Sequence, residues 1–202
     1  MTLRALERPA AGDARGALVL VHGRGADEHD LFPLLDALDP ERRFHGYTPR
    51  APLALPPGGA HWYAVPRVGY PDPATFHEGY ALLSGWIDAL PYERVVIGGF
   101  SQGAVMTYAV ALGRGRPRPA AVIALSGFIP EVEGWEPDLE PPFPPIVIAH
   151  GAYDPVIPVE FGRAALDTLV QAGAEPEYFE SPIQHSIDPG VVPDLQVLLA
   201  SL

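Results

Sequence analysis

The chain has 202 residues, 48% of them apolar, and a formal net charge of −12. Nucleic acids and anionic membrane surfaces are bound through cationic contacts, so this acidic balance argues against both as partners. The chain has no Cys and no Lys, which excludes disulfides, thiolate metal sites and Schiff-base chemistry.

The N-terminal segment, residues 1–17, contains five charged residues spaced along its length. They leave no room for the apolar region of a signal peptide. No run of about 18 apolar residues occurs anywhere in the chain, so no membrane span is expected. We therefore expect a cytoplasmic protein.

Strand-like and helix-like segments alternate through the first half of the chain. Residues 17–22 are almost entirely apolar and predict a buried strand, and residues 44–48 predict another. Between them, Asp27 is expected to cap a helix that ends at Leu38. Residues 49–73 contain many prolines and predict a long loop, of the kind that usually has a function.

The second half continues this alternation. Helices are predicted over residues 73–90, 102–112 and 159–172, with a last helix beginning near Pro193. Strands are predicted over residues 94–100, 120–126, 146–150 and 177–180, and residues 130–145 form a second proline-rich loop. Strands separated by helices imply an α/β fold with a mostly parallel central sheet and helices on both faces. One domain covering residues 1–202 is expected.

The segment from Gly99 to Gly103 contains the most informative residue, Ser101. It follows a predicted strand and precedes a predicted helix, which is the setting of a nucleophile elbow. Glycines on either side allow a turn so sharp that the serine hydroxyl stands clear of the backbone. Ser101 is therefore the candidate nucleophile.

A serine nucleophile needs a general base and an acid that orients this base. His185 follows the last short strand, and Asp154 follows the strand that ends at His150, so Ser101, Asp154 and His185 occur in the order typical of α/β-hydrolases. His22 and His150 end apolar strands, where a buried imidazole bonded to the backbone is expected.

An oxyanion hole needs two N–H donors. The N–H of Gln102, next to the serine, is one candidate, and the glycine-rich loop after the first buried strand offers the N–H of Arg24 as the second. The guanidinium of Arg24 has two interpretations, a clamp for a substrate carboxylate or a solvent-facing cation.

Five ordered motifs carry a resemblance to a known family over residues 18–199. They are Val21-His22-Gly23-Arg24-Gly25, Gly98-Gly99-Phe100-Ser101-Gln102-Gly103-Ala104, Leu125-Ser126-Gly127-Phe128-Ile129-Pro130, His150-Gly151-Ala152-Tyr153-Asp154-Pro155-Val156-Ile157-Pro158 and Gln184-His185-Ser186-Ile187. The chain resembles the bacterial phospholipase/carboxylesterase family of α/β-hydrolases, relatives of the acyl-protein thioesterases. The resemblance implies the same triad and oxyanion donors, and substrate-binding positions at Trp62, Phe128 and Val156.

This resemblance implies a serine hydrolase that forms an acyl-enzyme and needs no metal or other cofactor. Its substrates would be small-molecule esters with short to medium acyl groups, with thioesters and lysophospholipids as further options. Arg24 stands where the thioesterase relatives commonly have an apolar residue, which argues against a long acyl chain. An amidase or peptidase with the same triad and a non-catalytic binding module are the alternatives, and both a monomer and a homodimer stay open.

Overall fold

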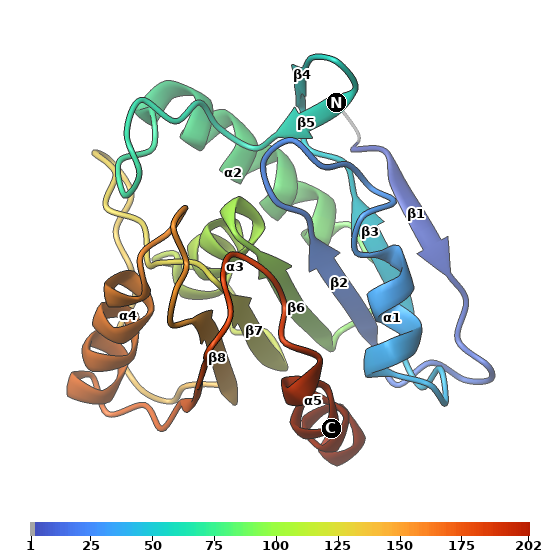
Figure 1. Ribbon diagram of the computed structural model, residues 1–202. Helices are drawn as coiled ribbons and strands as arrows, with labels where there is room; N and C mark the ends of the chain where they lie inside the picture. Colours follow the sequence, from blue (N-terminus) through green and yellow to red (C-terminus); the bar gives the residue numbers. More distant parts are fainter. Residues whose placement is uncertain (1–2) are drawn as a thin grey trace.

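A seven-stranded sheet runs through the computed structural model, which describes residues 3–202 (Figure 1). The strand order is β1-β3-β2-β6-β7-β8-β9. Only β1 runs antiparallel to its neighbour, and all other pairs are parallel, which confirms the mostly parallel sheet. The strands are β1 (Ala5–Arg8), β2 (Ala17–Val21), β3 (His45–Pro49), β6 (Val95–Phe100), β7 (Ala121–Leu125), β8 (Ile146–Gly151) and β9 (Glu177–Ser181).

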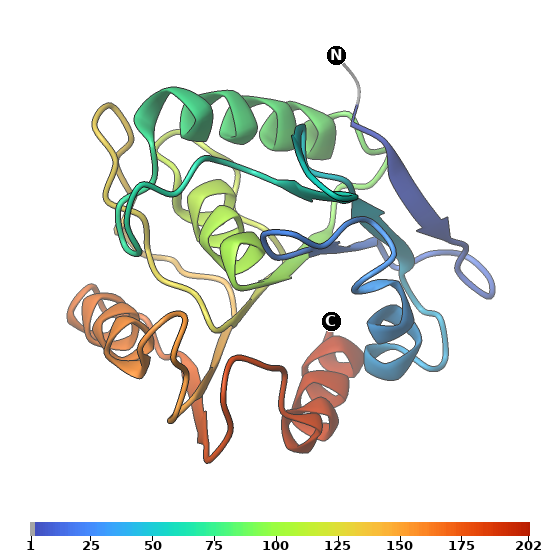
Figure 2. The ribbon, with the colours of Figure 1, turned by 45° about the horizontal axis from the view of Figure 1, so that its top comes forward.

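Helices cover both faces of this sheet, as predicted. One face holds α1 (Phe32–Leu38) and α5 (Val192–Ser201), which pack against each other, and the short 3₁₀ turn η1 (Pro189–Val191) leads into α5 (Figure 2). The other face holds α2 (Pro73–Asp88), α3 (Gln102–Leu112) and α4 (Val159–Gln171). None of the helices within residues 3–202 combines the length and apolar character that a bilayer-spanning helix requires.

Strand β2 shows how the sequence builds two cores. All five of its residues are buried. Because successive side chains of a strand point to opposite faces, Leu18 and Leu20 pack toward α1 and α5, whereas Val19 and Val21 pack toward α3. A strand covered on both sides has to be apolar throughout, which is the pattern that made it recognisable.

Helix α3 is buried along its whole length, from Gln102 to Leu112. It lies between the sheet and α2, so it has no face toward solvent (Figure 2). An amphipathic pattern is consequently absent, and apart from Gln102 at its start its residues are apolar or small on every side. Ser101, immediately before it, is thus anchored to the most deeply buried helix of the molecule.

Two predictions for the first half were incomplete. Strand β1 was not predicted, because it is a short edge strand with charged residues in it. The loop predicted over residues 49–73 contains a small hairpin, β4 (Leu53–Leu55) and β5 (Gly59–His61), paired antiparallel. Its turn holds Pro56, Pro57 and Gly58, so two of the prolines that predicted a long loop connect two strands.

The predicted cap at Asp27 was wrong. Helix α1 begins at Phe32, with Pro33 in its first turn, and has no side-chain cap. The Asp27 carboxylate instead accepts a hydrogen bond from the backbone N–H of His29, at 2.9 Å. Residues 28–31 form turns, so the helix starts later than the polar residue that seemed to announce it. By contrast, α2 begins at Pro73, as predicted, and Asp72 caps it.

Candidate active site

Ser101 occupies a strained turn between β6 and α3. Its φ is 57° and its ψ is −122°, a backbone conformation that residues other than glycine rarely adopt. A methyl group on Gly99 would lie 2.5 Å from the backbone of Gly103, and one on Gly103 would collide with the carbonyl of Val21 in β2. The two glycines therefore let strand and helix approach closely enough to form this turn, which has the form of a nucleophile elbow.

His185 joins Ser101 to Asp154. Its Nδ1 lies 2.6 Å from Oδ2 of Asp154, and its Nε2 lies 2.9 Å from Oγ of Ser101. A carboxylate only accepts hydrogen bonds, so Nδ1 carries the proton and Nε2 is left to accept from the serine hydroxyl. Three residues that are far apart in the sequence thus form one chain of hydrogen bonds.

Backbone groups hold Asp154 and bring His185 to it. Oδ1 of Asp154 accepts from the N–H groups of Val156 and Ile157, at 2.8 and 2.9 Å, which leaves Oδ2 for the imidazole. A methyl group on Gly151 would lie 2.3 Å from the carbonyl oxygen of Gln184. This glycine at the end of β8 therefore permits the close approach that places His185 beside Asp154, and nothing in the sequence alone identified it.

The loop after β2 passes directly against the serine. A methyl group on Gly23 would lie 3.2 Å from Cβ of Ser101. Gly25 N–H donates to the carbonyl of Ala60 in β5, and Ala60 N–H donates to the carbonyl of Ala26, both at 2.8 Å. The hairpin β4–β5 therefore holds this loop in place, and Arg24 lines the same cleft as Ser101 and Gln102.

This cleft opens to solvent beside Ser101 and has a cavity volume of about 90 Å³. Phe128 and Val156, two of the residues expected to bind substrate, line it. Trp62, the third, is fully buried, and its indole N–H donates to the carbonyl of His22 at 3.0 Å. The structure does not bring Trp62 to the cleft, and its neighbour Tyr63 lines it instead.

The side chain of Gln102 has a structural connection that the sequence did not suggest. Its Oε1 accepts from the backbone N–H of Trp62 at 2.7 Å, and its Nε2 donates to the carbonyl of Tyr63 at 2.8 Å. Both bonds are buried. One amide thus fixes the segment that forms a wall of the cleft to the residue next to Ser101.

His22 and His150 are buried and bonded to the backbone, as predicted. Nε2 of His22 accepts from the N–H of Ala51 at 3.0 Å, so its Nδ1 donates to the carbonyl of Gly23. Burial lowers the pKa of His22 below its ordinary value of 6.5 and keeps it neutral. Nε2 of His150 lies 2.8 Å from the carbonyl of Ile157, beside the backbone that holds Asp154.

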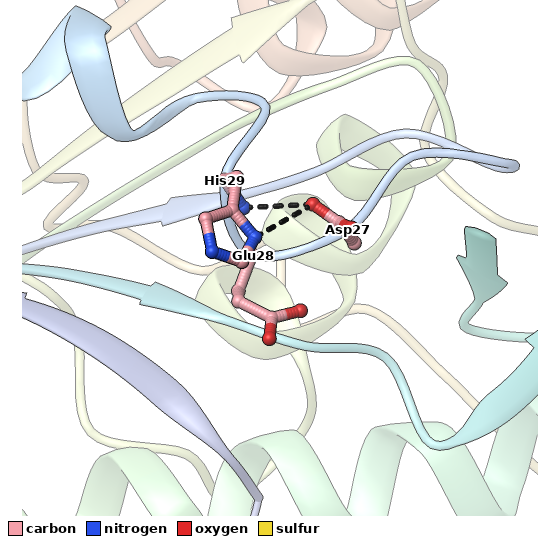
Figure 3. A group of neighbouring side chains, drawn as sticks. All are labelled: Asp27, Glu28 and His29. Atoms are coloured by element: carbon pink, nitrogen blue, oxygen red, sulfur yellow. Dashed lines mark hydrogen bonds and ion pairs between the residues drawn. The ribbon is translucent and has the colours of Figure 1, made fainter. Parts of the chain in front are cut away.

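Asp27, Glu28 and His29 form a second group of titratable side chains, close enough together to suggest a cation site (Figure 3). Glu28 is buried, and Arg4 and Arg50 each form an ion pair with it at 2.8 Å. Burial raises the pKa of Glu28, but the hydrogen bond and charge of Arg50 outweigh it and hold the pKa below the ordinary value. Arginines already compensate this charge, so we interpret the group as an ion-pair network.

Comparisons with known proteins identify the family of this chain. A profile of the phospholipase/carboxylesterase family matches residues 7–201. The chain belongs to this family. It is 30% identical to acyl-protein thioesterase 1 of Candida albicans over 200 residues, which covers 86% of this chain and 85% of the thioesterase.

Solved structures of esterases share the fold. Esterase PE8 superimposes with a TM-score of 0.81 at 25% identity, covering 100% of this chain and 99% of the esterase. The Bacillus cereus carboxylesterase superimposes with a TM-score of 0.85 at 18% identity, covering 99% of this chain and 95% of that carboxylesterase. The chain is therefore a carboxylesterase-type hydrolase with the α/β-hydrolase fold, and its family hydrolyses esters and thioesters.

Proposed function

We propose that Ser101, His185 and Asp154 are the catalytic triad of a serine esterase that forms an acyl-enzyme. The observation that carries this proposal is the hydrogen-bond chain through His185, with distances of 2.6 and 2.9 Å. Nucleophile, base and orienting acid each have the partner that the reaction requires. The strained backbone of Ser101 places the serine in the wall of the cleft, and the cleft supplies the space for an ester.

In the first half of the reaction, Oγ of Ser101 bonds to the ester carbonyl carbon while Nε2 of His185 takes the proton of the serine hydroxyl. The oxygen that becomes negative is stabilised by the N–H groups of Gln102 and Arg24. The alcohol, or the thiol of a thioester, leaves with the proton from His185. Asp154 stabilises the imidazolium during this step.

In the second half, His185 takes a proton from water as the water oxygen bonds to the acyl carbon. Collapse of this intermediate breaks the bond to Oγ, which recovers its proton from His185, and the carboxylic acid is released. The same cleft holds the acyl group throughout.

Replacement of the nucleophile tests this proposal. Ser101→Ala is expected to lower kcat on nitrophenyl butyrate by several orders of magnitude, roughly 10⁴–10⁶, and to abolish labelling by a fluorophosphonate. Ser84→Ala, which removes a buried hydroxyl of α2, is the matched control and should keep both properties. If Ser101→Ala retained about a tenth of wild-type turnover, another group would have to be the nucleophile.

A further inference from the structure

Two charged side chains line the cleft beside Ser101, and both are arginines. Arg24 lies in the loop after β2, and Arg67 lies in the segment between β5 and α2. Among residues 3–202 no Asp or Glu lines this cleft, although the chain has 25 acidic residues and 13 basic ones. The cleft is therefore a positive region on a molecule of net charge −12.

Neither guanidinium has a carboxylate partner in the part of the chain that the structure describes. Most other arginines do form ion pairs with Asp or Glu, namely Arg4, Arg8, Arg42, Arg43, Arg50, Arg114, Arg116, Arg118 and Arg163. Arg15 and Arg94 also lack one, but they precede β2 and β6, at the opposite end of the strands from Ser101. Most arginines of this molecule are thus paired with a carboxylate, whereas the two at the cleft are available to bind an anion.

Arg67 is held in position by its own turn. Its guanidinium stacks over the ring of Tyr70, 3.6 Å from the ring centroid, and Tyr70 N–H donates to the Arg67 carbonyl at 3.0 Å. Gly69 in this turn has a φ of 84° and packs so closely on Phe161 of α4 that a methyl group would lie 2.8 Å from its ring. Stacking uses the face of the guanidinium and leaves its N–H edges available for an anion.

The rest of the lining is largely apolar, with Val65, Val68 and Phe128 among its side chains. We infer that the preferred substrates are esters that carry a carboxylate, which Arg24 and Arg67 bind while Ser101 attacks the ester carbonyl. The apolar lining would contact the carbon chain between the two groups. This inference rests on the proposed function and adds a substrate class to it.

Paired substrates that differ in one charge test the inference. The acyl series compares mono(nitrophenyl) adipate with nitrophenyl adipamate, and the alcohol series compares para-carboxyphenyl butyrate with para-carbamoylphenyl butyrate. An exposed ion pair changes binding by up to about fivefold, so two arginines predict a kcat/KM advantage of about tenfold for the carboxylate in at least one series. This advantage should shrink in about 1 M NaCl, where the Debye length is about 3 Å.

Three variants identify the source of the advantage. Arg67→Met should reduce it to about threefold or less, and Arg67→Lys should keep most of it, because the charge is retained. Arg94→Met removes the same charge far from the cleft and should leave the advantage unchanged. The inference is wrong if neither series favours the carboxylate, or if Arg94→Met reduces the advantage as much as Arg67→Met. Either result leaves the proposed function intact as long as Ser101 is required for hydrolysis of neutral esters.

Discussion

At the scale of single residues, Gln102 combines two duties that depend on different atoms. Its backbone N–H is the proposed oxyanion donor. Its side-chain amide instead accepts a hydrogen bond from the N–H of Trp62 and donates one to the carbonyl of Tyr63. Removal of the amide leaves the buried N–H of Trp62 without a partner, which costs about 1–3 kcal/mol. The carbonyl of Tyr63 loses one hydrogen bond but keeps the one with Nδ1 of His61, at 3.1 Å. The side chain can therefore be tested without changing the backbone donor.

Gln102→Ala is expected to lower the free energy of unfolding by about 1–3 kcal/mol and to reduce kcat/KM, because the amide no longer holds Tyr63 in the wall of the cleft. Urea unfolding and ester kinetics measure the two effects. Gln196→Ala is the matched control, since its amide also donates to a backbone carbonyl but lies on the surface, and it should cost less than about 0.5 kcal/mol. Equal losses in the two variants would contradict the assigned connection.

The grouping of Ser101, Asp154 and His185 could be predicted because each follows a recognisable strand, and parallel strands end at the same edge of the sheet. The choice between Trp62 and its neighbour could not be predicted. Both are aromatic residues of one irregular segment, and only the tertiary structure decides which of them packs beneath His22 and which lines the cleft.

At the scale of elements, the site depends on how closely α3 approaches β2 and β6. Gly103 in the first turn of α3 lies against the carbonyl of Val21, and any side chain there would displace the helix. Ser101 immediately precedes this turn, so a displacement would also disturb its hydrogen bond to His185. Close packing of these elements and the geometry of the nucleophile are therefore coupled.

Gly103→Ala is expected to lower stability by about 1–3 kcal/mol, as overpacking of a core does, and to reduce ester hydrolysis at least tenfold. Gly85→Ala provides the opposite case. Gly85 is exposed in α2, and a methyl group added there would have nothing within 4 Å, so the same substitution should raise stability by about 0.5–1 kcal/mol and leave activity unchanged. Thermal unfolding and ester kinetics of both variants measure these effects. If Gly103→Ala changed neither stability nor activity, α3 would have room to move.

Strands buried on both faces could be predicted, and of the two edge strands of the sheet only β9 was, whereas β1 was not. The central strands β2, β6, β7 and β8 are apolar runs between turn residues. Strand β1 and the β4–β5 hairpin are short and partly exposed, so no periodic pattern distinguishes them from loops. Yet this hairpin holds the loop that contains Arg24, which makes the least predictable element part of the site.

At the scale of the whole molecule, the acidic charge is compensated locally rather than evenly. Hydrogen bonds with Arg163 lower the pKa of Glu180, and a backbone N–H of His29 lowers that of Asp27. A carboxyl group whose pKa is lower in the folded state stabilises the folded protein at pH values above the ordinary carboxyl pKa. This stabilisation is lost as the pH falls through the lowered pKa. Repulsion within a chain of net charge −12 acts in the other direction, because protonation relieves it.

His22 separates these effects, because imidazoles titrate at a higher pH than carboxyls. Burial lowers its pKa below 6.5 in the folded state, so the unfolded chain binds a proton that the folded chain resists. Its contribution to stability is complete above pH 6.5 and falls as the pH decreases toward the lowered pKa. The free energy of unfolding, measured in urea, should therefore decrease from about pH 7 to about pH 5.5.

This decrease should be smaller in His22→Gln, whose amide has no charge to gain. His29→Gln is the matched control, because His29 is an exposed histidine of the same loop, and it should behave like the wild type. Carboxyl groups titrate mainly below about pH 5, so the difference between the two variants belongs to His22. If both variants kept the full wild-type slope, a protonated imidazole would be tolerated in the wall beneath the active site, and the hydrogen bond from Ala51 to His22 would have to be dispensable.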